Sequence, residues 1–131
     1  MPSFGKRSTS SLGTCDERLQ EVFNEAINHR DFSIICGHRT RKAQDEAHAM
    51  GFSKKQWPDS KHNQMPSKAI DALPYPIDWS DRERIAHFSG FILGIAQLKG
   101  FNMRWGGDWN RDGVTKDEKF FDGAHFEIVG D

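Results

Sequence analysis

Two histidines in this sequence stand close to acidic residues outside the helical patterns, an arrangement that is typical of metal sites. The nearer pair is His62 and Asp71, with eight residues between them, and Asp71 sits inside an apolar, β-prone run at residues 69–73. A carboxylate in such a run is costly to bury unless a cation compensates its charge. A zinc ion would supply that charge, and the neutral imidazole of His62 is a natural second ligand.

A third metal-binding side chain is predicted at His125, near the C-terminal end of the chain. If residues 124–129 form a strand, His125 and Glu127 share one face of it. Asp122 lies just before this strand, where Gly123 allows the chain to bend. Two histidines and one aspartate leave a fourth position for water, as in catalytic zinc sites. Glu127 has two interpretations, a general base or a residue that orients the His125 imidazole.

Spacing alone does not require a metal, because a chain with six histidines and nineteen acidic residues contains such groupings by chance. The other four histidines need no special role: His29, His38, His48 and His87. The two cysteines, Cys15 and Cys36, form no CxxC motif and no disulfide framework. Both are therefore interpreted as ordinary thiols without a metal or redox role.

A second cation site is suggested by the polar loop that starts at residue 108. Residues 108–113 follow the first half of an EF-hand loop, with oxygen ligands at alternate positions and a glycine at the sixth. Lys119 replaces the glutamate of the twelfth position, so the loop is not an EF-hand sensor. Two interpretations stay open, a polar turn that needs no ion or a surface calcium (Ca²⁺) site. The calcium ligands would be Asp108, Asn110, Asp112, Glu118 and the carbonyl of Val114.

The composition excludes several classes of protein. The chain has 131 residues, with 18 Lys and Arg against 19 Asp and Glu, which gives a formal net charge of −1. That balance argues against a nucleic-acid partner, and the length predicts one domain over residues 1–131. No apolar run is long enough for a signal peptide or a membrane span. We therefore expect a protein that is made in the cytoplasm, has no membrane insertion and acts as a monomer.

The pattern of elements predicts an α+β fold with a small antiparallel sheet and about three helices. Thr14 and Glu17 resemble a capping box at the start of the first helix. The stretch from Phe52 to Lys68 is expected to be a loop, of a length that is usually functional. Apolar spacing and β-prone runs predict helices over residues 15–30, 40–50 and 80–99, and strands over residues 32–36, 69–73, 103–105 and 124–129.

Several stretches resemble, in the right order, the motifs of the zinc D-alanyl-D-alanine carboxypeptidase superfamily. Within it, the chain is most similar to the small bacteriophage endolysins that are L-alanyl-D-glutamate peptidases. The likeness covers almost the whole chain. The stretches that carry it are Gly37-His38-Arg39-Thr40 with Gln44, Ser60-Lys61-His62, Ala69-Ile70-Asp71, Asp122-Gly123-Ala124-His125, the opening Ser3-Phe4-Gly5-Lys6, the turn at residues 74–79 and the loop at residues 105–110.

The resemblance implies the zinc D,D-peptidase, or Hedgehog-like, fold and one catalytic zinc ion (Zn²⁺). It assigns Asp122 as the catalytic acid and base and Arg39 as the residue that stabilises the substrate carbonyl. Ser60 matches a position beside the first ligand. Many superfamily members have six residues between the first two ligands where this chain has eight, and the carboxypeptidase branch has Glu at the position of Asp122. The implied zinc ligands are His62, Asp71 and His125.

The function implied by the resemblance is hydrolysis of the L-Ala–D-Glu bond in the peptide stem of bacterial peptidoglycan, which lyses the host cell. The alternatives are a D-alanyl-D-alanine carboxypeptidase or dipeptidase, and a metal-binding module on the same scaffold. Such an endolysin starts in the host cytoplasm and reaches the periplasm and cell wall only after a separate protein permeabilises the membrane. No separate wall-binding domain is expected.

Lysines before Asp71 add a further question about the substrate. They either meet the anionic peptide stem or form an ordinary solvated loop. These residues are Lys54, Lys55, Lys61 and Lys68.

Calcium bound to the loop at residue 108 would order the segment that leads to Asp122 and so tune activity.

Overall fold

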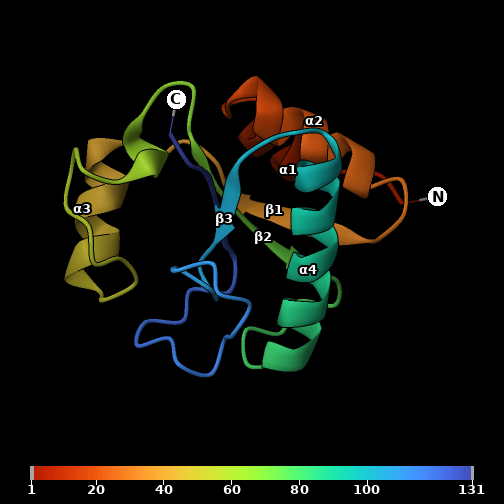
Figure 1. Cartoon of the computed structure of the whole chain (residues 1–131). Helices are drawn as coiled ribbons and strands as arrows, with labels where there is room; N and C mark the ends of the chain where they lie inside the picture. The colour runs from red at the N-terminus through yellow and green to blue at the C-terminus, as the bar shows by residue number, and fades with distance from the viewer. Residues whose placement is uncertain (1, 131) are drawn as a thin grey trace.

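The computed structural model describes residues 2–130. Within these residues, four strands form one antiparallel sheet in the order β1-β2-β4-β3. The architecture is α+β with a small antiparallel sheet, as predicted (Figure 1). The elements are α1 (Lys6–Leu12), α2 (Glu17–Ala26), β1 (Phe32–Cys36), α3 (Arg41–Ala49), the 3₁₀ helix η1 (Lys61–Asn63), β2 (Ala69–Pro74), α4 (Arg82–Leu98), β3 (Met103–Trp105) and β4 (His125–Ile128).

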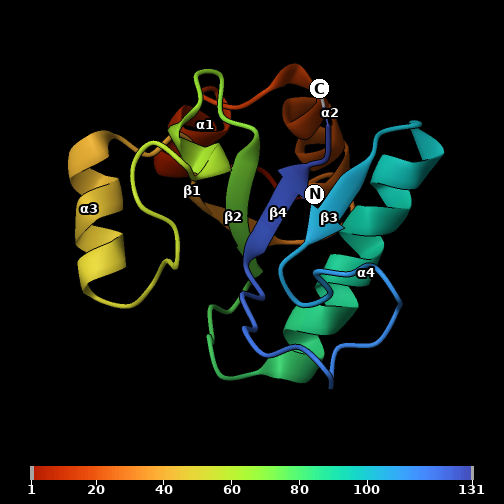
Figure 2. The ribbon, with the colours of Figure 1, turned by 60° about the vertical axis from the view of Figure 1, so that its left-hand side comes forward.

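The sheet separates an apolar core from a polar face, because side chains alternate along each strand. Ile70, Phe126 and Trp105 are paired across β2, β4 and β3 and belong to the buried core. Asp71 and His125, each one residue away from this row, are paired on the opposite face. Helices α2 and α4 lie on the core side, whereas α3 lies across the sheet from them (Figures 1 and 2).

Aromatic rings fill the core beneath the polar face. The ring of Phe126 is fully buried and packs edge-on against Phe23 of α2 and Phe88 of α4, at centroid distances of 5.6 and 6.3 Å. Phe32 of β1 lies 5.0 Å from Phe88 and continues the cluster. This packing fixes the position of β4 relative to α2 and α4, and with it the position of the polar residues on the other face of the strand.

Helix α1 was not predicted, because its sequence carries no apolar periodicity. Its role is local: Ser8 is buried and its hydroxyl accepts a hydrogen bond from the backbone N–H of Ile34 at 3.0 Å. Since β1 is an edge strand of the sheet, α1 supplies a partner for a backbone donor that would otherwise lack one. The contact is made by a polar residue, so the spacing of hydrophobic residues could not predict the helix.

The capping box predicted from Thr14 and Glu17 was wrong. Helix α2 begins later, at Glu17, and the side chain of Asp16 caps it by accepting from the backbone N–H of Arg18 at 2.9 Å. The Thr14 hydroxyl instead donates to the carbonyl of Ser11 and accepts from the N–H of His38 at 2.9 Å. Thr14 thus joins the end of α1 to the loop that follows β1.

Differences at the other boundaries are small. Helix α4 begins at Arg82 instead of Ser80, because the side chain of Asp81 accepts from the N–H of Arg84. The predicted loop from residue 52 to 68 contains η1.

Over residues 2–130, no helix is both long and apolar enough to span a membrane.

Candidate metal centre and active site

The polar face of the sheet carries a row of side chains that could bind a metal. Asp71 lies in the middle of β2, where it is paired with Cys36 of β1 on one side and His125 of β4 on the other. Residues that face each other in an antiparallel sheet project their side chains to the same side. Three strands therefore present Cys36, Asp71 and His125 side by side, above the core.

His62 reaches this row from η1. The hydroxyl of Ser60 accepts a hydrogen bond from the N–H of His62. The side-chain oxygen of Asn63 accepts from the N–H of Ser60, which completes a capping box. The Nδ1 atom of His62 donates to the carbonyl of Gly37 at 2.8 Å. This bond turns Nε2 toward Asp71, and the Ser60 hydroxyl holds the backbone of the same residue.

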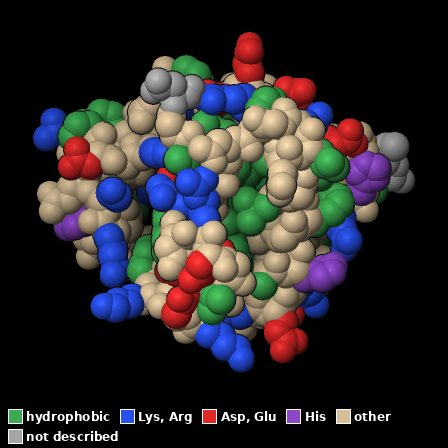
Figure 3. All heavy atoms as spheres, viewed as in Figure 1, with side chains coloured by type: hydrophobic (Ala, Val, Ile, Leu, Met, Phe, Trp, Pro, Cys, Tyr) green, Lys and Arg blue, Asp and Glu red, His purple; other side chains and the backbone are tan. Residues whose placement is uncertain are grey.

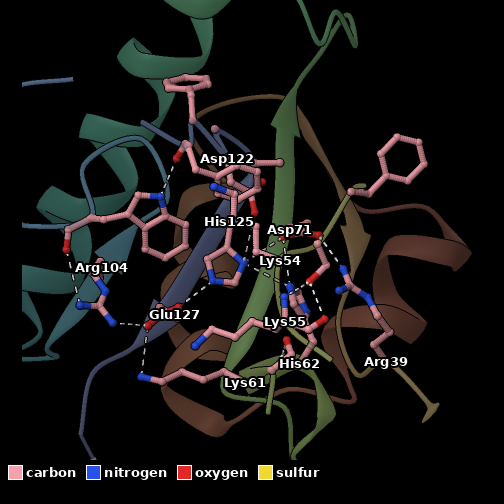
Figure 4. Close-up of a pocket in the computed structure, with 18 of the residues that line it drawn as sticks. Arg39, Lys54, Lys55, Lys61, His62, Asp71, Arg104, Asp122, His125 and Glu127 are labelled. Atoms are coloured by element: carbon pink, nitrogen blue, oxygen red, sulfur yellow. Dashed lines mark hydrogen bonds and ion pairs between the residues drawn. The ribbon is translucent and has the colours of Figure 1, made fainter. Parts of the chain in front are cut away.

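Three donor atoms converge at this point (Figure 4). Nε2 of His62 lies 3.2 Å from Oδ1 of Asp71 and 3.3 Å from Nδ1 of His125, and the last two atoms are 3.5 Å apart. Ligands bound at about 2.0–2.1 Å in a tetrahedral zinc site are separated by about 3.4 Å. The donor set of two imidazoles and one carboxylate therefore fits zinc in both chemistry and spacing.

Electrostatics in this cluster are consistent with a site built for a cation. Burial disfavours the charged form of His62, but the facing Asp71 carboxylate outweighs burial and raises the pKa of His62 to about 10. Burial by itself would raise the pKa of Asp71, but His62 and His125 outweigh burial and hold this pKa well below the usual range. Two imidazoles thus keep Asp71 ionised, the form in which it can bind a metal.

Glu127 orients the third donor. Its Oε1 atom lies 2.8 Å from Nε2 of His125, while its Oε2 atom lies 2.7 Å from Arg104 and 3.2 Å from the ammonium of Lys61. Although burial opposes ionisation, the hydrogen bonds from His125 and Arg104 lower the pKa of Glu127 well below its usual value. An ionised Glu127 can only accept, so His125 carries its proton on Nε2 and presents Nδ1 to the cluster.

Asp122 stands beside the donors without joining them. Its carboxylate lies 3.9 Å from Nδ1 of His125, and its backbone N–H donates to the carbonyl of Gly106. Burial, followed by the nearby charge of Asp71, raises the pKa of Asp122 to about 6. A side chain on Gly106 would come within 2.2 Å of the Asp122 carbonyl, so this close approach requires glycine.

Arg39 lies on the other side of Asp71. One guanidinium nitrogen is 3.4 Å from Oδ2 of Asp71, and another donates to Oε1 of Gln44 at 3.0 Å. Gln44 is fully buried on α3, and its amide also donates to the carbonyl of Lys55 at 2.7 Å. Gln44 therefore connects the side chain of Arg39 to the loop after α3. Its place in the motif did not reveal this role.

Two residues around the site, Cys36 and Arg104, were not expected there. Cys36 was interpreted as an ordinary thiol, but its sulfur and the donor atoms of His62 and Asp71 all lie within 4.8 Å of one another. Its pairing with Asp71 follows a register shift in β1, which no sequence pattern shows. The sequence placed Lys61 among the lysines that could meet the substrate and Gln44 in a motif, but it assigned neither residue the contacts described above. Arg104 gave one usable signal, a charged residue between Met103 and Trp105 in a predicted strand.

The cluster opens into a cavity of about 1050 Å³. Its walls come from the loop after α3, from η1, from the start of α4 and from the segment before Asp122. The space-filling view shows a hollow between α3 and the loops that precede β4, with lysine and arginine side chains near it (Figure 3). A cleft of this size holds an extended peptide or a similar ligand.

The loop that starts at Asp108 brings its acidic side chains together. Carboxylate oxygens of Asp108, Asp112 and Glu118 all lie within 4.8 Å of one another, and the amide of Asn110 lies 3.2 Å from Asp112. Asp108 also accepts from the N–H groups of Asp112 and Gly113, so the turn is ordered by its own backbone. The four side chains among the predicted calcium ligands thus form one cluster.

Trp109 connects this loop to the metal-binding cluster. Its backbone N–H donates to the carboxylate of Glu118 at 3.0 Å, and its indole Nε1 donates to the carbonyl of Phe120 at 2.7 Å. The indole ring packs against the imidazole of His125 with a centroid distance of 5.3 Å. Movement of the acidic loop would therefore reach both His125 and the segment that ends at Asp122.

Comparisons with known proteins identify the family and the fold. The sequence model of the phage L-alanyl-D-glutamate peptidase family matches residues 2–129. The L-alanyl-D-glutamate peptidase of Escherichia phage T5 is 35% identical over 136 residues, which covers 96% of this chain and 97% of the relative. The crystal structure of the Serratia marcescens L-Ala D-Glu endopeptidase ChiX has a similar fold, with a TM-score of 0.75 at 24% identity, over 96% of this chain and 89% of the other.

Proposed function

The chain belongs to the phage L-alanyl-D-glutamate peptidase family, and from this membership we propose that it hydrolyses the L-Ala–D-Glu bond in the peptide stem of bacterial peptidoglycan. It is a peptidase and a peptidoglycan hydrolase. The observation that carries the proposal is the convergence of His62 Nε2, Asp71 Oδ1 and His125 Nδ1, at 3.2–3.5 Å from one another, beside Asp122 in an open cleft.

One catalytic zinc ion is the cofactor that we assign to this cluster. His62, Asp71 and His125 would hold it, and each of the two imidazoles already has its other nitrogen occupied by a hydrogen bond. When bound, zinc lowers the pKa of a coordinated water to about 7 and polarises a carbonyl oxygen. Cys36 is not required, because two histidines and one aspartate complete a catalytic set with one position open.

Asp122 and Arg39 supply the remaining chemistry. The Asp122 carboxylate accepts a proton from the attacking water and delivers it to the leaving nitrogen of D-glutamate. Its raised pKa, about 6, suits both halves of this transfer near neutral pH. Arg39, at the edge of the cleft, stabilises the negative charge that develops on the alanine carbonyl oxygen. Glu127 orients His125 and takes no proton from water, because His125, Arg104 and Lys61 occupy its oxygens.

Calcium is the second ion that we propose, at the acidic loop formed by Asp108, Asn110, Asp112 and Glu118. Hard oxygen donors of this kind suit calcium, and mutual repulsion between close carboxylates would be relieved by it. Through Trp109, an ordered loop would steady both His125 and the segment before Asp122.

The biological setting follows from the phage family. We propose that the enzyme lyses the bacterial host, that it is made in the host cytoplasm, and that it reaches the periplasm after a separate membrane-permeabilising protein acts. Residues 1–131 would form a single catalytic domain that works as a monomer.

Digestion of purified peptidoglycan tests the reaction. The new chain ends are labelled and identified, before and after metal removal with a chelator and after zinc is returned. We expect new alanine carboxyl and D-glutamate amino ends, their loss with the chelator, and their return with zinc.

Other products would contradict the proposal in distinct ways. Released D-alanine would indicate a D,D-carboxypeptidase or dipeptidase. No new ends from a protein that binds zinc would indicate a metal-binding module on the same scaffold.

A further inference from the structure

The cleft contains cations of two kinds. Three of its basic residues are neutralised by carboxylates within the site: Arg39 by Asp71, and both Lys61 and Arg104 by Glu127. The other basic residues of the wall form no ion pair with any residue of the described chain. These residues are Lys54, Lys55 and Arg82. Among the acids of the wall, Asp59 likewise has no basic partner in the described chain, whereas Asp122 lies 3.9 Å from Nδ1 of His125. Positive charge is therefore available to a ligand.

Lys54 places its charge next to the catalytic segment. Its ammonium lies 4.8 Å from the centre of the Phe120 ring, and Phe120 comes two residues before Asp122. Phe120 is itself fixed by the bond from the indole of Trp109 to its carbonyl. The loop that carries Lys54 is anchored through the carbonyl of Lys55, which accepts from buried Gln44. Figure 4 shows Lys54 and Lys55 on the same side of the cleft as His62.

The proposed substrate carries a negative charge at the matching place. In the peptide stem, D-glutamate is joined to the next residue through its side-chain carboxyl, which leaves its α-carboxylate free. That carboxylate and the leaving nitrogen are attached to the same carbon atom. Because Asp122 must reach the nitrogen to protonate it, the α-carboxylate comes close to Asp122. Two carboxylates at this distance repel each other unless a cation lies between or beside them.

Arg82 and Lys55 are less suited to this role. The Arg82 guanidinium covers the ring of Phe121 at 4.3 Å, and that ring packs edge-on against Trp105 in the core. Arg82 thus serves the packing beneath the segment. Within the described chain, the Lys55 side chain forms no ion pair and no cation–π contact, although its backbone anchors the loop.

We propose that Lys54 binds the α-carboxylate of D-glutamate and makes the enzyme specific for stems in which this group is a free acid. The inference rests on the proposed function, since it assumes that D-glutamate provides the leaving nitrogen. Lys54 is a specificity-determining residue: it contacts the substrate but takes no part in proton transfer.

Two soluble stem peptides test the assignment. One contains D-glutamate and the other contains D-isoglutamine, whose carboxamide has the same shape without the charge. We expect the native enzyme to cleave the acid with about tenfold higher kcat/KM than the amide, as for loss of one charge-assisted hydrogen bond. In Lys54→Met the ratio falls to about one, through a slower reaction with the acid alone, and Lys54→Arg keeps the preference.

Lys55→Met and Arg82→Met are the matched controls, because each removes one positive charge from the same cleft. Both should keep the preference for the acid. Equal cleavage of both peptides by the native enzyme, a preference that survives in Lys54→Met, or one that is lost in either control would overturn the assignment of Lys54. Cleavage at another bond would instead refute the proposed function. The thermal midpoint of Lys54→Met, an exposed position, confirms that the variant is folded.

Discussion

The Nε2 atom of His125 lies 2.8 Å from the Oε1 atom of Glu127, two residues further along strand β4. The two side chains share the polar face of the sheet, and the carboxylate holds the imidazole in the tautomer that presents Nδ1 to Asp71 and His62. Glu127 is in turn held by Arg104 and Lys61. On this basis we propose that Glu127 orients His125 and that Asp122 is the general base.

Asp122→Asn and Glu127→Gln should therefore fail in different ways. Loss of the base in Asp122→Asn is expected to lower kcat by about 10²–10⁴-fold while zinc remains bound. Loss of the orienting carboxylate in Glu127→Gln is expected to weaken zinc binding by about 10–100-fold. Zinc content by atomic absorption and turnover on peptidoglycan fragments measure the two effects. An inactive Glu127→Gln variant with full zinc content would reverse the assignment of the base.

Arg104→Met tests whether the hydrogen bond from Arg104 to Glu127 affects zinc affinity. The guanidinium of Arg104 donates to Glu127 at 2.7 Å, so its loss leaves His125 less firmly oriented. We expect zinc affinity to fall by up to about tenfold, measured by competition with a chromophoric chelator. Arg41→Met is the control, because Arg41 is exposed on α3 and its ion-pair partner is Asp45, outside the site. Equal affinities in both variants would show that Glu127 orients His125 without help from Arg104.

The pH dependence of kcat/KM should show an acid limb that belongs to Asp122. Burial and the charge of Asp71 raise the pKa of Asp122 to about 6, so the carboxyl keeps its proton to a higher pH than an ordinary aspartate. A base must be unprotonated to act, and the rate therefore rises with pH until this group has ionised. A bound cation favours the ionised form, which places the limb at or below pH 6. A limb well above neutral pH in the zinc-loaded enzyme would point to a different base.

Calcium should stabilise the native protein through the acidic loop. Binding to the folded state alone raises the thermal midpoint, by an amount that grows with calcium concentration. In Asp112→Asn the increase should be much smaller, because one of three close carboxylates is lost. Asp45→Asn, an exposed acid on α3, controls for general effects of charge. If calcium changes neither the midpoint nor the turnover of zinc-loaded enzyme, the loop is a polar turn without an ion.

The core beneath β4 should dominate stability. Phe126→Ala removes a fully buried ring between Phe23 and Phe88 and is expected to lower the free energy of unfolding by about 3–5 kcal/mol. Leu98→Ala, at a side chain that is 91% exposed, should change it by less than about 0.5 kcal/mol. Urea unfolding followed by tryptophan fluorescence measures both values. Similar losses in the two variants would contradict the packing described for β4.

Much of the fold could be predicted because the signals are local. Strands β1 and β3 have the predicted bounds, since short apolar runs ended by glycine, or set between polar loops, mark them directly. Alternation along β4 was enough to place His125 and Glu127 on one face. Helix α1 was missed and the cap at Thr14 was wrong, because both depend on hydrogen bonds to residues distant in the sequence, Ile34 and His38.

The sequence by itself determined which side chains could do chemistry here, and on which face of which element they would stand, because residue type and periodicity are properties of neighbours along the chain. Only the tertiary structure decided that Nε2 of His62 meets Nδ1 of His125, 63 positions away, and that Lys61 is tied to Glu127 while Lys54 stays available in the cleft. Strand register and loop packing set those distances. They result from contacts across the whole domain, which no local pattern contains.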